Sequence, residues 1–152
     1  MELPIPDLND FGLLPAGRHD CNLNDIPTVY VYNDHRRGLW EDFERFLQWV
    51  SGQPSPGVML VDGGFTSDKA APKDIDVVFD LTSCDDNTKR FWFFQYGTMR
   101  DYFETQYRVD FWVYIPGANN DLRAFFEHVK PEEAIVRGMQ STDRKGMLRI
   151  TL

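Results

Sequence analysis

Two neighbouring stretches organise this sequence: Val-Met-Leu-Val-Asp-Gly-Gly at residues 58–64 and Asp-Ile-Asp-Val-Val-Phe-Asp-Leu at residues 74–81. The first is a continuous apolar run that enters a pair of glycines, which is typical of a buried strand followed by a tight turn. The second alternates acidic and aliphatic residues, as a strand with one polar face does. The pattern therefore predicts two strands of one sheet, joined by a polar connection over residues 66–73.

The rest of the chain predicts a mixed set of helices and strands around that sheet. Asp34 can cap a helix whose apolar residues recur at spacings of three and four. The expected elements are helices at 34–51, 87–106 (one helix or two) and 122–129, and strands at 108–115 and 147–152. Proline-containing residues 1–33 are expected to form an extended N-terminal arm with a short strand at 28–32. We therefore expect one α/β (α+β) domain over residues 34–152, a mixed sheet flanked by helices.

The net charge and the short apolar runs of the chain argue against several functional classes. The 152 residues include 16 Lys and Arg against 24 Asp and Glu, a formal net charge of -8. Such a charge argues against broad electrostatic capture of nucleic acid or of an anionic membrane. The sequence begins without the basic and apolar pattern of a signal peptide, and its apolar runs are too short to span a bilayer. We therefore expect a cytoplasmic protein that does not bind membranes.

Three aspartates form the main candidate site. Asp74 and Asp76 are two residues apart on an expected strand, so their side chains point to the same face, and Asp110 has an equivalent place on a later strand. Convergent carboxylates are explained by a bound divalent cation, by a basic partner or by exposure to solvent. Magnesium suits such oxygen ligands, and the upstream pair Gly63 and Gly64 would let the backbone approach a phosphate.

This combination resembles the nucleotidyltransferase superfamily of the polymerase-beta type. The resemblance implies that Gly63 and Gly64 hold a nucleoside triphosphate, and that Asp74, Asp76 and Asp110 bind two Mg²⁺ ions. It also implies that Asp110 activates the attacking hydroxyl.

The loop after the glycines contains further candidates for phosphate binding. Gly64 stands where the superfamily often has serine, so Thr66 or Ser67 would have to supply a hydroxyl to the phosphate. Lys69 in the same loop could neutralise triphosphate charge, and it could equally be a solvated surface charge.

A closer resemblance covers nearly the whole chain. It rests on Leu-Pro-Ala-Gly-Arg-His-Asp-Cys at residues 14–21, on the stretch from Val61 to Asp76, and on Thr-Asp-Arg-Lys-Gly-Met-Leu-Arg-Ile at residues 142–150. These stretches look like a family of small, uncharacterised bacterial and phage proteins with a nucleotidyltransferase-like core. Lys145 and Gly146, in the last of them, would make either a phosphate contact or a plain turn into the terminal strand, and we favour the turn.

Two functional readings follow. The first is a Mg²⁺-dependent enzyme that transfers a nucleoside monophosphate from a nucleoside triphosphate to an unknown acceptor, RNA or protein. The alternative is a catalytically inactive interaction protein of the same fold, an antitoxin or a partner in phage defence or counter-defence, with a protein partner or a second copy. A basic rim for RNA could also be formed by five arginines, which could equally be scattered surface charges: Arg36, Arg37, Arg90, Arg100 and Arg108.

Overall fold

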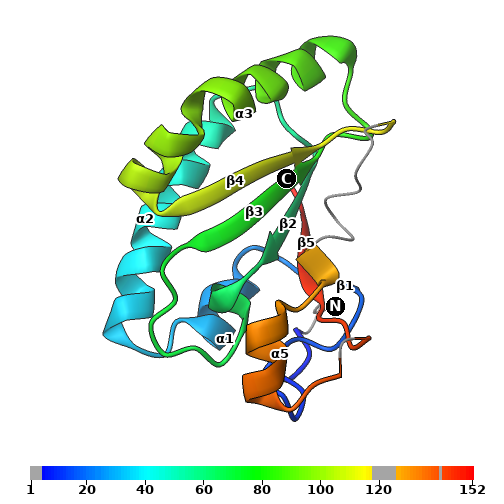
Figure 1. Cartoon of the computed structure of the whole chain (residues 1–152). Helices are drawn as coiled ribbons and strands as arrows, with labels where there is room; N and C mark the ends of the chain where they lie inside the picture. The colour runs from blue at the N-terminus through cyan, green and yellow to red at the C-terminus, as the bar shows by residue number, and fades with distance from the viewer. Residues whose placement is uncertain (1–4, 118–125, 141) are drawn as a thin grey trace.

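A computed structural model of the chain describes residues 5–117, 126–140 and 142–152. It contains a five-stranded mixed sheet in the order β1-β5-β2-β3-β4 (Figure 1). The strands are β1 (Arg18–Asp20), β2 (Val58–Asp62), β3 (Ile75–Asp80), β4 (Val109–Tyr114) and β5 (Met147–Thr151). The α-helices are α1 (Asp25–Tyr30), α2 (Asp34–Ser51), α3 (Asp86–Tyr107) and α5 (Pro131–Arg137), and a 3-10 turn, η1, spans Gly64–Thr66.

The sheet combines parallel and antiparallel pairs. Strand β2 pairs antiparallel with both β3 and β5, whereas β4 is parallel to β3 and β1 is parallel to β5. The long helix α3 connects the parallel strands β3 and β4, which need such a crossover. This mixed sheet with helices confirms the α+β class expected from the sequence.

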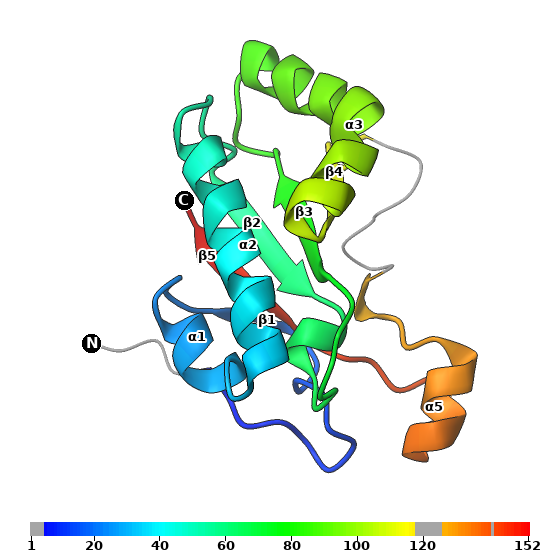
Figure 2. The same ribbon diagram turned by 90° about the vertical axis from the view of Figure 1, so that its left-hand side faces the viewer.

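One face of the sheet carries the main core. Helices α2 and α3 lie together on this face, while α5 lies away from both (Figures 1 and 2). The apolar side of α2 predicted from its spacing is buried there, and ring contacts join Phe46 of α2 to Phe79, Phe103 and Phe111. Aromatic packing of this kind buries a large area in a small protein and fixes the helices on the strands.

Most of the expected elements are found, with local corrections. Residues 86–107 form one helix, so Gly97 does not divide it. Asn33, not Asp34, caps α2, because its side chain accepts a hydrogen bond from the backbone N–H of Arg36. Helix α5 was not anticipated. Of the helix expected at 122–129, residues 122–125 lie outside the described residues, and residues 126–127 are helical.

The N-terminal region differs from the extended arm that was expected. The strand predicted at 28–32 is wrong, because Thr28 to Tyr30 belong to helix α1. The buried side chains of Ile26 and Tyr30 are four residues apart, on one side of that helix, and both join the main core. Burial of these two side chains outweighs the β propensity of Thr-Val-Tyr-Val-Tyr.

No helix among the described residues is both long and apolar enough to cross a membrane.

Candidate cation and phosphate site

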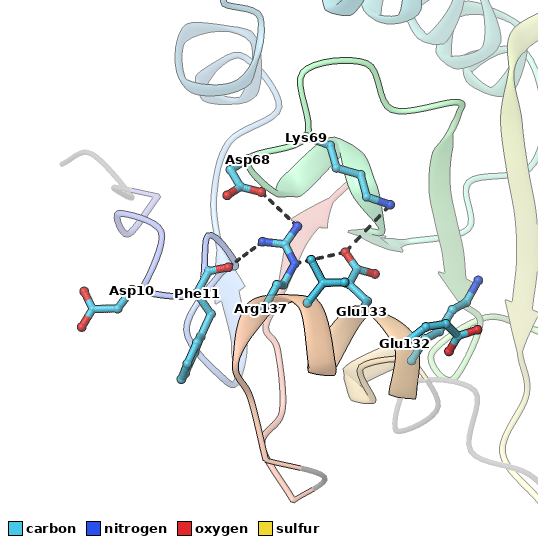
Figure 3. A pocket seen from close by; sticks show the side chains of 9 residues that line it. Asp10, Phe11, Asp68, Lys69, Glu132, Glu133 and Arg137 are labelled. Atoms are coloured by element: carbon cyan, nitrogen blue, oxygen red, sulfur yellow. Dashed lines mark hydrogen bonds and ion pairs between the residues drawn. The ribbon is translucent and has the colours of Figure 1, made fainter.

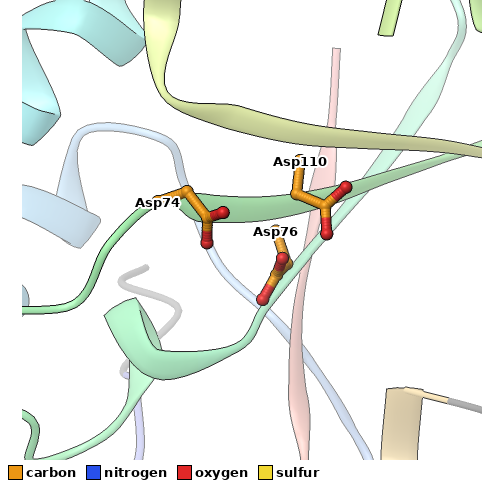
Figure 4. A group of neighbouring side chains, drawn as sticks. All are labelled: Asp74, Asp76 and Asp110. Carbon is orange, nitrogen blue, oxygen red and sulfur yellow. The ribbon is translucent and has the colours of Figure 1, made fainter. Parts of the chain in front are cut away.

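The three candidate aspartates meet on the sheet face opposite α2 and α3. Asp76 lies on β3 directly opposite Asp110 of β4, and Asp74 immediately precedes β3. Each offers one carboxylate oxygen, and these three atoms lie within 4.8 Å of one another. Figure 4 shows the carboxylates pointing into the same space. The alternation of the strands predicted this convergence, and metal binding by the three residues stays a prediction.

A fourth carboxylate, that of Asp62, lies beside these three. Together the four aspartates form an acidic row: Asp62, Asp74, Asp76 and Asp110. Asp62 ends β2 and pairs in register with Asp76, so three neighbouring strands each place an aspartate on the same face. Asp62 is only 1% exposed, and neither carboxylate oxygen has a hydrogen-bond partner among the described residues. Its nearest cation is Lys145, whose Nζ lies 3.7 Å from Oδ1. A buried carboxylate without hydrogen bonds is costly, and a cation bound at the row would lower that cost.

The electrostatics of the row favour bound positive charge. Burial, followed by repulsion from Asp74 and Asp110, raises the pKa of Asp76 to about 9. Burial also raises the pKa of Asp74, with Asp110 adding to the shift. The pKa of Asp62 rises to about 6, again through burial, although Lys145 opposes the rise. Without a cation Asp76 holds a proton at neutral pH, and a divalent cation would displace it.

Helix α3 supplies a further acid beside Asp74. Burial, followed by repulsion from Asp74 and by a hydrogen bond with it, raises the pKa of Glu104 to about 7. Sequence reasoning missed Glu104, because no local pattern indicates which residues of α3 face the start of β3. It also missed Asp62, although the alternation of β2 from Val58 to Asp62 could have placed that side chain on the acidic face.

Gly63 makes room for this cluster. Its φ of 83° lies in the region that favours glycine, and a Cβ there would overlap the carboxylate of Asp76. Gly64 has no such constraint, since an added Cβ would meet the flexible side chain of Lys69 at 3.1 Å. Both glycines line the cavity next to the aspartates, but the absolute need for glycine is at residue 63.

The two hydroxyls expected to contact phosphate are used within the loop. Thr66 Oγ1 donates to the carbonyl of Gly63 at 3.3 Å, and Ser67 Oγ donates to that of Gly64 at 2.7 Å. Both residues are buried and do not line the cavity. Both hydroxyls therefore stabilise the conformation of the loop.

The side chain of Arg36 fixes the same loop by hydrogen bonds to its backbone carbonyls. Its guanidinium is fully buried and donates to the backbone carbonyls of residues 30, 64, 65, 67 and 69, at distances from 2.6 to 3.3 Å. Arg36 is therefore not part of a basic rim for RNA, contrary to one sequence-based hypothesis. It instead fixes the path of the loop from η1 to Lys69.

A cavity of about 690 Å³ opens over the aspartates. Carboxylates and lysines predominate among the residues that line it. The lining consists of Gly63, Gly64, Lys69, Pro72, Lys73, Asp74, Asp76, Asp110, Trp112, Phe126, His128, Lys130, Pro131, Glu133 and Lys145. Of the candidate residues in the glycine loop, the structure brings Gly63, Gly64 and Lys69 to the cavity. Carboxylates together with surrounding lysines suit a ligand that combines divalent cations with phosphate.

Two arginines expected at an RNA rim are also engaged. Arg100 Nη2 lies 3.2 Å from Asp110 Oδ1, and its guanidinium stacks over the ring of Trp112 with the carbon 4.1 Å from the centroid. Arg108 pairs with Asp42 at 2.7 Å. Arg100 therefore orients one carboxylate of the row, and Arg108 joins α2 to the start of β4.

A second cavity of about 620 Å³ adjoins the first and shares Lys69, Lys130 and Glu133 with it. Figure 3 shows Arg137 of α5 at its centre, bonded to Asp68, to Glu133 and to the carbonyl of Phe11. The Nζ of Lys69 lies 3.8 Å from Glu133. Helix α5 is thus tied to the glycine loop at the boundary between the cavities.

The fold and the site together define a small α+β protein with a row of aspartates beneath a lysine-lined cavity. The chain belongs to DUF6932, a family of unknown function, whose model matches residues 6–151. This agrees with the uncharacterised family expected from the sequence, while the nucleotidyltransferase-like core stays a prediction. Comparison with curated proteins and with solved structures gave no match.

Proposed function

We propose that this protein is a metal-dependent nucleotidyltransferase that moves a nucleoside monophosphate from a nucleoside triphosphate to an acceptor hydroxyl. The observation that carries the proposal is the convergence of Asp74, Asp76 and Asp110 within 4.8 Å on one sheet face, beneath a cavity lined with lysines. Asp62 supports it, since its buried carboxylate, at the end of the same row, has no hydrogen-bond partner in the part of the chain that the structure describes.

The three aspartates would hold two Mg²⁺ ions, as the resemblance to polymerase-beta-type enzymes implies. Bound Mg²⁺ supplies charge neutralisation for the phosphates and lowers the pKa of a coordinated hydroxyl. The backbone at Gly63 and Gly64 and the cavity lysines would orient the triphosphate. The acceptor oxygen bonds to the α-phosphorus, the bond from that phosphorus to the bridging oxygen breaks, and pyrophosphate leaves. Asp110 would take the proton of the acceptor hydroxyl.

Cation binding is the first test. Mn²⁺ should raise the melting temperature of the wild-type protein, because it relieves repulsion in the row and binds only the folded state. Asp76→Asn should remove most of that rise. Asp80→Asn is the matched control, because Asp80 lies on the same strand but its carboxylate accepts hydrogen bonds from Thr82. Equal shifts in the wild type and in Asp76→Asn would place the cation elsewhere.

Transfer is the second test. The protein is incubated with Mg²⁺, each of the four triphosphates labelled at the α-phosphate, and a lysate of the host as the source of acceptors. Label should move to RNA or protein, distinguished by nuclease and protease treatment, and Asp74→Ala should abolish the transfer. Cation binding without nucleotide binding or transfer would instead favour the alternative, an inactive interaction protein of this fold.

A further inference from the structure

We propose that Lys145 is a polyphosphate-binding residue of the cavity, in addition to being the counterion of buried Asp62. This inference rests on the proposed function and names the side chain that contacts the transferred substrate's phosphates. The observation behind it is a lysine held inside the cavity whose ammonium group has, among the described residues, one long contact, with Asp62.

The backbone at residues 145 and 146 is fixed before β5 begins. The N–H of Lys145 donates to the carbonyl of Glu127 at 2.9 Å, and the N–H of Gly146 donates to that of Leu14 at 3.0 Å. A Cβ at Gly146 would collide with the carbonyl of Pro15, so glycine is required for this close approach. These bonds join residues 145 and 146 to distant segments and do not form the turn expected at this motif, and they determine where the side chain of Lys145 starts.

The side chain of Lys145 is more enclosed than that of a typical surface lysine. It is 18% exposed, whereas the side chain of Lys69 is 52% exposed, and both line the cavity over the aspartates. Lys69 also lies beside Glu133, at the boundary with the second cavity. Lys145 is thus the cavity lysine that combines low exposure with a position next to the acidic row.

The contact with Asp62 leaves the ammonium donors of Lys145 available. The Nζ to Oδ1 distance of 3.7 Å is within ion-pair range but too long for a hydrogen bond, and both oxygens of Asp62 lack hydrogen bonds among the described residues. An ammonium group has three donors, and phosphate oxygens are strong acceptors for them. A polyphosphate in this cavity would therefore find a lysine that is already in place.

The test uses inorganic tripolyphosphate with Mg²⁺, measured by calorimetry, because this probe lacks the unidentified base. Lys145→Met alone would leave Asp62 buried without a counterion and could unfold the protein. The informative variant is therefore Asp62→Asn with Lys145→Met, which removes both charges of the pair and leaves the net charge unchanged. Lys89→Met, on α3 and outside the lining of the cavity, is the control for loss of a lysine elsewhere.

We expect the double variant to bind tripolyphosphate about tenfold more weakly than the wild type, in line with loss of one charge-assisted contact. Its Mn²⁺ affinity, measured without tripolyphosphate, should fall no further than that of Asp62→Asn alone, because Lys145 contacts the phosphates and not the cation. Lys89→Met should match the wild type in both measurements.

Wild-type affinity for tripolyphosphate in the folded double variant would overturn the inference and leave Lys145 as a counterion only. Absence of tripolyphosphate binding by the wild type would overturn it as well. The proposed function fails on separate grounds, if Asp76→Asn does not reduce the Mn²⁺-induced rise in melting temperature and Asp74→Ala does not abolish transfer of the label.

Discussion

The two faces of the sheet are built from alternate residues of the same strands, yet they are stabilised by different physics. On β4, Phe111 faces α2 and α3 and is fully buried, whereas its neighbour Asp110 faces the cavity and is half-buried. The helix-covered face gains stability from packed aromatic rings. The cavity face gathers like charges that repel, so it holds a destabilising arrangement that a cation would relieve. The comparison indicates that one face maintains the fold, whereas the other carries the proposed ligand site.

The largest expected effect tests the helix-covered face. Phe111→Ala should lower the free energy of unfolding by about 3–5 kcal/mol, because it leaves a cavity among the rings of Phe46, Phe79 and Phe103. Asp110→Asn, one residue away but on the other face, should leave the stability of the metal-free protein unchanged or higher. Urea denaturation of both variants measures the difference. Similar losses from the two substitutions would contradict the division into two faces.

The next effect is a pH dependence that arises on the cavity face. The pKa of Asp76 is raised from 3.8 to about 9, so between these values the folded protein binds more protons than the unfolded chain. Metal-free protein should therefore lose stability as pH rises from 5 to 8, on the order of 4 kcal/mol. Glu104 and Asp62 act in the same direction, because their pKa values are also raised.

Asp76→Asn should flatten that dependence and should be more stable than the wild type at pH 8 without metal. Urea titrations in the presence of a chelator measure both quantities. Mg²⁺ should also reduce the loss at pH 8, since it binds the ionised form of the folded state. A wild-type protein that is more stable at pH 8 than at pH 5 would show that the aspartates are not repelling one another.

A smaller effect distinguishes the two glycines beside the row. Gly63→Ala should cost about 1–3 kcal/mol, because φ at residue 63 is 83° and the added Cβ displaces the carboxylate of Asp76. Gly64→Ala should cost less than about 1 kcal/mol, since Lys69 can move. Gly63→Ala should also weaken Mn²⁺ binding. Thermal unfolding with and without Mn²⁺ decides the point, and equal behaviour of the two variants would remove the special role of residue 63.

The smallest effect concerns the boundary between the two cavities. Lys69→Met should change the free energy of unfolding by less than about 0.5 kcal/mol, because its ion pair with Glu133 is long and half exposed. If Lys69 contacts phosphate, the same variant should weaken tripolyphosphate binding, which calorimetry detects. A substantial loss of stability would instead mean that Lys69 holds α5 against the glycine loop.

Local patterns predicted much of the fold because each depended on residues close in sequence. The spacing of apolar residues in α2 and the alternation of β4 are produced by one helix or strand meeting one apolar face. Helix α5 also had local signals that were missed: Pro131 at its start, acidic residues in its first turn and Gly138 after its end. The failure at Thr28 to Tyr30 has another cause, since burial of Ile26 and Tyr30 decided that segment.

For the candidate site, sequence alternation was enough to place Asp74, Asp76 and Asp110 on one polar face, because side-chain direction in a strand follows from its period of two. Only the tertiary structure decided which distant residues meet that face. Asp62 joined the row through the register of β2 with β3, Lys145 reached it through the segment that leads into β5, and Arg36 was buried beneath the glycine loop. Charge and spacing alone do not reveal such contacts, because they depend on how separate elements pack.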